Sequence, residues 1–169
     1  MISIITKEIN DLPILEICDS EKLGEELPLV FFYHGWTGCK ERVLTQGYEI
    51  AKKGFRVILP DALYHGDRQE GDVKGHVLEF WKIVLNSVKE FPTLVDYYRE
   101  NVGIKDGFVG VSGLSMGGIT TNALMTTYPW INAGVFSKVC TRFGFSASLS
   151  RAAIAPCAFS CPAVTGSSS

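Results

Sequence analysis

The sequence predicts an α/β fold with a mostly parallel, doubly wound sheet that begins with an antiparallel hairpin. Three observations predict this fold. Two β-like segments near the N-terminus are joined by the turn signal Asn10-Asp11, and apolar strand-like runs then alternate with helical segments as far as residue 136. A glycine-flanked serine also stands between a strand and a helix within 107–128. Alternation of strands with helices implies parallel strands joined by right-handed crossovers.

The first half of the chain supplies the hairpin and two further strands. The hairpin strands are expected at 2–9 and 12–18. Residues 27–33 (LPLVFFY) form an unbroken apolar run, which is typical of a strand buried on both faces. A helix is expected over 39–53, and the run FRVIL at 55–59 predicts the next strand.

The second half alternates helices with strands. An amphipathic helix over 76–90 is expected to bury its apolar stripe in the core, and Pro92 is expected to start a second helical piece. A strand at 107–112, a helix at 119–128 and a strand at 131–136 follow. The apolar stripe of the first of these helices consists of Val77, Leu78, Trp81, Val84, Leu85 and Val88.

Residues 113–118 (GLSMGG) have the pattern of a nucleophile elbow. A serine on so sharp a turn adopts a strained backbone, and the residues two before and two after it crowd each other. Gly113 and Gly117 satisfy that requirement around Ser115. A glycine-rich turn that merely contains a serine is the alternative, and the strand before and the helix after this serine favour the elbow.

Composition excludes several classes of protein. The 169 residues are 46% hydrophobic and 20% charged, which is typical of one globular domain. A net charge of -2 and a pI near 5.9 indicate no nucleic acid or anionic membrane as partner. No apolar run reaches the roughly 18 residues of a membrane span, and the N-terminus lacks the pattern of a signal peptide. We therefore expect a cytoplasmic protein.

The five cysteines show no metal-ligand spacing. Cys18 and Cys39 are expected to be ordinary thiols. Cys157 and Cys161 have no companion cluster of His or Cys, so a zinc site is not expected. The sequence predicts neither a metal nor a cofactor.

Three segments together resemble the α/β-hydrolase superfamily. They are HGWTG at 34–38, PDALYHGDR at 60–68 and GLSMGG at 113–118. Their order and spacing are similar to those of small bacterial carboxylesterases of the dienelactone-hydrolase and prolyl-oligopeptidase type. The likeness covers about residues 12–136.

This resemblance implies roles for individual residues. Ser115 would be the nucleophile that forms an acyl-enzyme with a small carboxylic ester. The backbone N–H groups of Met116 and Trp36 would form the oxyanion hole. His34 and Gly35 would shape the loop that carries Trp36, with His34 hydrogen-bonded beneath it rather than acting in catalysis.

Three further polar residues lie in or near these segments. Asp61 is expected to fix a loop. His65 either borders the substrate pocket or stabilises a turn. His76 stands at a helix start and is given no function.

The chain departs from the superfamily after its serine. In the superfamily, the catalytic residues follow the order Ser, then Asp or Glu, then His. The last acidic residue here is Asp106 and the last histidine is His76, so no Asp, Glu or His follows Ser115. The catalytic acid and base are therefore unassigned, and the candidates for the base are His65, another chain or no residue at all.

Residues 137–169 also differ in character from residues 1–136. They are rich in Ser, Ala and Cys, contain no acidic residue and show no strand–helix unit. We interpret 1–136 as the N-terminal part of an α/β-hydrolase domain with the elbow. Residues 137–169 are interpreted as an atypical tail, disordered or frame-disrupted, of a truncated hydrolase. Such a chain would leave a sheet edge uncovered, which predicts self-association.

Two other functions are alternatives to a serine esterase. The absent acid and base favour an inactive protein that only binds small molecules or other proteins. A dinucleotide-binding module is disfavoured, because the glycines at 110, 113, 117 and 118 do not form G-x-G-x-x-G after the first strand.

Overall fold

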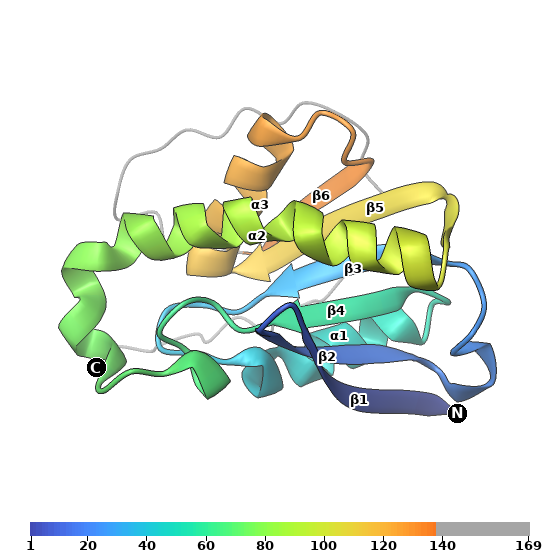
Figure 1. The fold of residues 1–169 in the computed structure, drawn as a ribbon, viewed down its shortest axis with the longest axis horizontal. Helices are drawn as coiled ribbons and strands as arrows, with labels where there is room; N and C mark the ends of the chain where they lie inside the picture. Colours follow the sequence, from blue (N-terminus) through green and yellow to red (C-terminus); the bar gives the residue numbers. More distant parts are fainter. Residues whose placement is uncertain (138–169) are drawn as a thin grey trace, which may run out of the picture.

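A computed structural model of the chain describes residues 1–137, and all structural statements below concern these residues. A six-stranded sheet with the order β1-β2-β4-β3-β5-β6 forms its centre (Figure 1). The expected fold class, an α/β-hydrolase type of mixed sheet with helices on both faces, is confirmed. The strands are β1 Ile2–Ile9, β2 Leu12–Asp19, β3 Leu27–Tyr33, β4 Arg56–Pro60, β5 Ile104–Leu114 and β6 Ala133–Ser137.

The N-terminal hairpin has the predicted turn. β1 and β2 pair antiparallel, with Ile9 opposite Leu12. Asn10 and Asp11 both adopt positive φ, at 50° and 62°, as a two-residue hairpin turn requires. β2 then pairs antiparallel with β4, whereas β4, β3, β5 and β6 run parallel to one another.

Three helices cover the two faces of the sheet. They are α1 Leu44–Ala51, α2 Phe80–Asn101 and α3 Met116–Thr127. Successive side chains of β3 point to opposite faces. Phe31 packs with Phe91 of α2 and Leu124 of α3, whereas Phe32 packs with Ala51 of α1. α2 and α3 therefore cover one face and α1 the other (Figure 1). Four short 3-10 segments complete the description: Ser20–Lys22, Lys40–Val43, Gly66–Arg68 and Val73–Glu79.

Pro92 does not divide α2, contrary to the sequence-based expectation of two helical pieces. A proline inside a helix lacks the N–H that would bond the carbonyl four residues earlier, which here is that of Val88. The hydroxyl of Tyr128, at the end of α3, donates to this carbonyl at 3.0 Å. A tertiary hydrogen bond thus replaces the helical one and allows α2 to continue.

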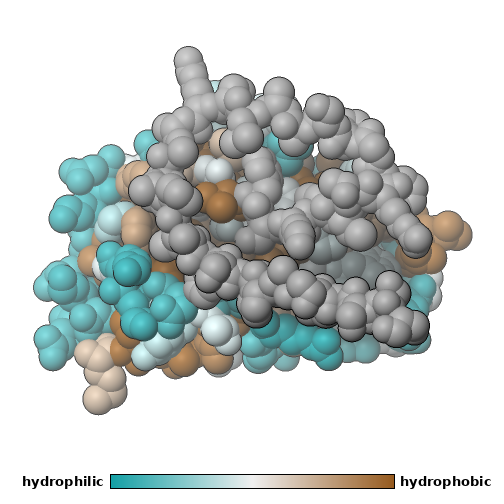
Figure 2. All heavy atoms as spheres, turned by 180° about the vertical axis from the view of Figure 1, so that it is seen from behind, coloured by the Kyte–Doolittle hydropathy of each residue, from teal (hydrophilic) through white to brown (hydrophobic). Residues whose placement is uncertain are grey.

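The expected core stripe of the 76–90 segment is wrong in four of its six positions. Val84 and Val88 are buried, as predicted. Leu78 is 95% exposed and Trp81 is 65% exposed, and Val77 and Leu85 are also exposed. The segment up to Glu79 is a kinked 3-10 helix, so the 3.6-residue period does not apply there. The first turns of α2 also extend past the sheet (Figure 1), and Figure 2 shows apolar side chains protruding on that side.

Other expectations for the chain have mixed outcomes. Over 39–53, a 3-10 turn precedes α1 in place of one continuous helix, and β5 is longer than the predicted 107–112. Cys18 and Cys39 are free thiols. Residues 1–137 contain no cluster of potential metal ligands and no helix long and apolar enough to cross a membrane. The predicted tail, with Cys157 and Cys161, lies outside the described residues after Ser137.

Replacing Tyr128 by Phe should destabilise the fold by about 1–2 kcal/mol, because the Val88 carbonyl loses its partner. In a Pro92→Ala background the new N–H can bond that carbonyl, so the same replacement should cost less. Urea unfolding of the four proteins measures the coupling. Tyr48→Phe, at an exposed position, serves as the control and should change stability by no more than about 0.5 kcal/mol. Equal costs in both backgrounds would contradict the replacement of one bond by the other.

Candidate active site

The residues singled out from the sequence meet at the carboxyl ends of three parallel strands. β3 leads into the turn at 34–38, β4 leads into Asp61 and His65, and β5 leads into Ser115. β3 lies between β4 and β5 in the sheet, so the three segments are neighbours. This edge is where open α/β sheets bind their ligands.

Ser115 occupies the turn between β5 and α3 with φ 51° and ψ -112°. Left-handed φ at a non-glycine residue is strained and persists only where the surroundings impose it. A Cβ atom on Gly113 would lie 2.5 Å from the Gly117 carbonyl carbon, and one on Gly117 would lie 2.2 Å from the Tyr33 carbonyl oxygen. Both glycines are therefore required for this turn, which leaves Ser115 exposed.

The turn after β3 packs directly on this serine. A Cβ atom on Gly35 would lie 3.4 Å from Cβ of Ser115. The turn is closed by a bond of 2.9 Å from the Gly38 N–H to the Gly35 carbonyl, and Thr37 adopts φ 62°. Trp36 thus follows a glycine that lies against Ser115. Met116 is the first residue of α3, where backbone N–H groups have no partner within the helix.

His34 is buried under this turn, and both of its ring nitrogens are bonded. The Ala62 N–H donates to Nε2 at 3.1 Å, so Nδ1 carries the hydrogen and donates to the Gly35 carbonyl at 2.9 Å. Burial lowers the pKa of His34. The side chain therefore links the loop after β3 to the loop after β4, which is the geometry of a structural histidine.

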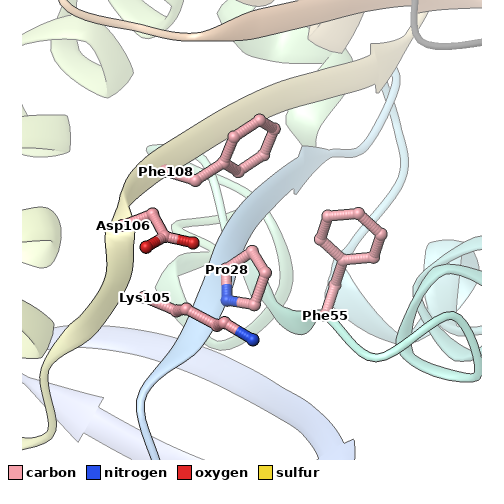
Figure 3. Close-up of a pocket in the computed structure, with 5 residues that line it drawn as sticks. All are labelled: Pro28, Phe55, Lys105, Asp106 and Phe108. Atoms are coloured by element: carbon pink, nitrogen blue, oxygen red, sulfur yellow. The ribbon is translucent and has the colours of Figure 1, made fainter.

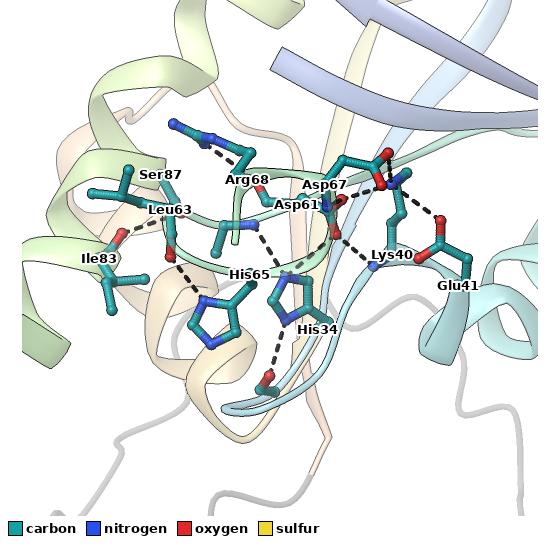
Figure 4. A network of polar contacts seen from close by, with 12 residues as sticks. His34, Lys40, Glu41, Asp61, Leu63, His65, Asp67, Arg68, Ile83 and Ser87 are labelled. Atoms are coloured by element: carbon teal, nitrogen blue, oxygen red, sulfur yellow. Dashed lines mark hydrogen bonds and ion pairs between the residues drawn. The ribbon is translucent and has the colours of Figure 1, made fainter. Parts of the chain in front are cut away.

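Asp61 connects the same two loops through a buried ion pair (Figure 4). Its Oδ1 accepts from the Lys40 N–H at 2.8 Å, and its Oδ2 accepts from Lys40 Nζ at 2.6 Å and from the Asp67 N–H at 3.0 Å. Burial opposes the charge of Lys40, but its hydrogen bonds to Asp61 and Asp67 outweigh this effect and raise its pKa. Sequence reasoning expected Asp61 to fix a loop and missed Lys40, because nothing local marks a lysine as fully buried.

Gly66 allows the carboxylate of Asp61 to approach. It has φ 54°, and a Cβ atom there would lie 2.2 Å from both carboxylate oxygens of Asp61. The glycine in the segment at 60–68 is thus explained by a close approach within the loop.

His65 is almost fully buried, with an exposed fraction of 2%. Its Nδ1 bonds the Leu63 carbonyl at 2.8 Å, and its ring lies 5.1 Å from the ring of His34 and 5.3 Å from that of Trp36. Nε2 has no hydrogen-bond partner among the described residues. Burial lowers the pKa of His65.

Two residues outside the predicted set complete this side of the site. Phe80, the first residue of α2, lies 5.6 Å from Trp36 between ring centroids. The ring of His76 stacks on Tyr64 at 3.9 Å and bonds Glu79 and the Glu70 carbonyl. His76 therefore braces the segment before α2, and the sequence analysis gave this residue no function because it stands at a helix start.

A shallow pocket elsewhere does not belong to this site. Its lining residues lie at the amino ends of the parallel strands (Figure 3). Ser115 follows the carboxyl end of β5, at the opposite edge of the sheet. The lining residues present one lysine and one aspartate on an open surface. The lining consists of Pro28, Phe55, Lys105, Asp106 and Phe108.

Comparisons with known proteins show the family of this chain. The sequence pattern of the dienelactone hydrolase family matches residues 18–137. The chain belongs to the dienelactone hydrolase family. It is 42% identical over 139 residues to "Putative esterase YitV" of Bacillus subtilis (strain 168), which covers 80% of this chain. It is 35% identical over 131 residues to "Esterase YjfP" of Escherichia coli (strain K12), which covers 78% of this chain.

This dienelactone hydrolase family chain spans 53% of the length of each of these two relatives. Among solved structures, TT1662 from Thermus thermophilus matches with a TM-score of 0.67 at 20% identity. That match covers 80% of this chain and 56% of the other. At this identity the match concerns the fold alone.

Gly117→Ala should destabilise the protein by about 3 kcal/mol or more, because the methyl group would meet the backbone at Tyr33, which cannot move aside. Thermal or urea unfolding measures the loss. Gly75→Ala is the matched control, since a Cβ there meets nothing within 4 Å, and it should be neutral within about 0.5 kcal/mol. Similar stabilities of the two variants would contradict the close approach.

Stability should fall as the pH decreases below about 6.5, the usual pKa of histidine. The pKa values of His34 and His65 are lowered by burial, so in this window the unfolded chain binds more protons than the folded one. His76 acts with the opposite sign, because its bond to Glu79 raises its pKa. Between about pH 7.5 and 5.5, His65→Asn should reduce the loss of stability and His76→Gln should increase it. Urea midpoints at the two pH values test this, and identical losses in all three proteins would refute it.

Proposed function

We propose that this chain carries the nucleophile of a carboxylic ester hydrolase, with Ser115 forming an acyl-enzyme. The observation that carries the proposal is the backbone of Ser115, held at positive φ between β5 and α3 with its side chain exposed. A turn of this kind presents a serine hydroxyl to a carbonyl carbon. Membership of the dienelactone hydrolase family and the esterase names of the two relatives support it.

The reaction would proceed in two halves. The Ser115 oxygen attacks the ester carbonyl and loses its proton, and the carbonyl oxygen becomes an oxyanion. The N–H groups of Met116 and Trp36 would stabilise that charge, assisted by the N-terminus of α3. Collapse expels the alcohol with a proton and leaves an ester on Ser115, which water then hydrolyses to release the acid.

The histidines of this chain are the candidates for a proton acceptor near Ser115. No Asp, Glu or His follows Ser115, and the three histidines of the chain all precede it. His34 and His76 use both ring nitrogens in hydrogen bonds within the described residues. Ser115 would therefore receive little activation from either of these residues.

A second candidate function follows from this observation. A chain with the elbow but without an acid and base after the serine would bind small esters without hydrolysing them efficiently. The strained turn at Ser115 counts against this alternative, because simple binding requires no such turn.

Labelling by a fluorophosphonate separates the two functions, since such reagents react with an activated serine. A hydrolase should gain one reagent mass in intact-mass spectrometry, and Ser115→Ala should abolish the gain. Ser20→Ala is the control and should label like the parent chain. A folded protein that gains no mass would contradict the hydrolase proposal and favour the binding function.

A further inference from the structure

His65 carries a buried hydrogen-bond acceptor that nothing in the described residues uses. Its Nδ1 lies 2.8 Å from the Leu63 carbonyl, which can only accept, so Nδ1 carries the ring hydrogen. Nε2 therefore presents a lone pair, and it has no partner although the residue is 98% buried. The two other histidines differ, because each has both ring nitrogens bonded.

A buried hydrogen-bond acceptor without a donor is uncommon. The large majority of buried side-chain polar atoms in folded proteins are hydrogen-bonded, and an unpaired one weakens the fold. Protonation would give Nε2 a hydrogen but not a partner, and burial keeps the imidazole neutral by lowering its pKa. His65 is thus held as a neutral acceptor with a fixed tautomer.

The position of the ring relates this acceptor to the candidate site. The ring of Trp36 stands edge-on to it at 5.3 Å, and Trp36 belongs to the turn that packs on Ser115. Figure 4 shows the rings of His65 and His34 beside each other, below the loop that follows β4. The Leu63 carbonyl holds Nδ1 on the loop side, so Nε2 points away from that loop.

We propose that Nε2 of His65 accepts a hydrogen bond from an O–H or N–H group of the ester substrate. The inference rests on the proposed esterase function and deepens it, because it names a substrate class: esters that carry a hydroxyl or amide donor near the scissile carbonyl. A neutral acceptor favours such donors and disfavours a ketone or carboxylate oxygen at the same place. His65 is then a specificity-determining residue rather than a catalytic one.

Two pairs of small esters test the preference with minimal change in shape. N-acetylglycine ethyl ester carries an amide N–H where ethyl 4-oxopentanoate carries a methylene group. Ethyl 3-hydroxybutanoate carries a hydroxyl that ethyl butanoate lacks. The donor-bearing member of at least one pair should bind about tenfold more tightly in ligand-detected NMR titrations. The pair that discriminates shows whether the donor is an amide or a hydroxyl.

Nitrogen NMR of the protein labelled with 15N-histidine reports on the acceptor itself. The resonance of the unprotonated His65 nitrogen should shift on addition of the preferred ester and should not shift with its isostere. This readout needs no turnover, and a role confined to supporting the loop would leave it unchanged.

Two substitutions separate the two ring nitrogens. His65→Asn retains a donor near Nδ1 for the Leu63 carbonyl and removes the acceptor at Nε2, so the affinity ratio within the pair should fall to about one. His65→Gln places a polar atom near Nε2 and should retain part of the preference. A thermal midpoint close to that of the parent chain verifies that each variant is folded.

Four results would overturn the inference. Equal affinities within both pairs in the parent chain would mean that Nε2 meets no substrate donor, as would equal shifts with both members of a pair. An affinity ratio unchanged in His65→Asn would place the donor contact elsewhere. Loss of Ser115 labelling in His65→Asn, without any preference between esters, would make His65 a proton acceptor for the serine.

The inference and the proposed function fail in different measurements. Absence of fluorophosphonate labelling, together with a donor preference that His65→Asn removes, would refute the hydrolase and leave the binding role of His65 intact. Labelling at Ser115 without any donor preference would support the hydrolase and refute the role of His65.

Discussion

The contact on which the site depends is that between Gly117 and the backbone at the end of β3. A side chain at Gly117 would overlap the Tyr33 carbonyl, so only glycine lets α3 approach this closely. The approach fixes the first turn of α3 against the loop that follows β3. It also forces the chain at Ser115 into positive φ and brings Gly35 against that serine. Ser115 and the neighbouring turn are thus positioned by one packing constraint between backbones, which is stiffer than any contact between side chains.

Buried polar groups stiffen the other side of the site. Asp61 accepts hydrogen bonds from two loops, and Lys40 lies fully buried against it. Charges taken out of water are tolerated only when all their bonding groups are satisfied, so this pair restricts the loops to one arrangement. His34 adds two further bonds between the same loops. Nε2 of His65 differs from these groups, because it is buried beside them without a hydrogen-bond partner among the described residues.

Much of the fold follows from local pattern, and the exceptions have identifiable causes. The apolar run at β3 and the Asn10-Asp11 turn predicted their elements well, because burial on both faces and positive φ leave direct traces in the sequence. The predicted division of the helix at Pro92 was wrong, because the hydroxyl that replaces the missing helical hydrogen bond comes from Tyr128 at the end of another helix. The predicted burial of the apolar stripe that includes Trp81 was also largely wrong, because an apolar helix face is buried only where another element packs on it.

The sequence by itself determined the strand order along the chain, the hairpin and the elbow around Ser115, because each depends on residues close together in the chain. Only the tertiary structure decided which polar side chains are buried. Lys40 and Asp61 are 21 residues apart and meet through strand pairing, and Tyr98 reaches Glu16 across 82 residues. A charged residue has the same local signature in the core and on the surface, so its burial depends on partners that folding brings to it.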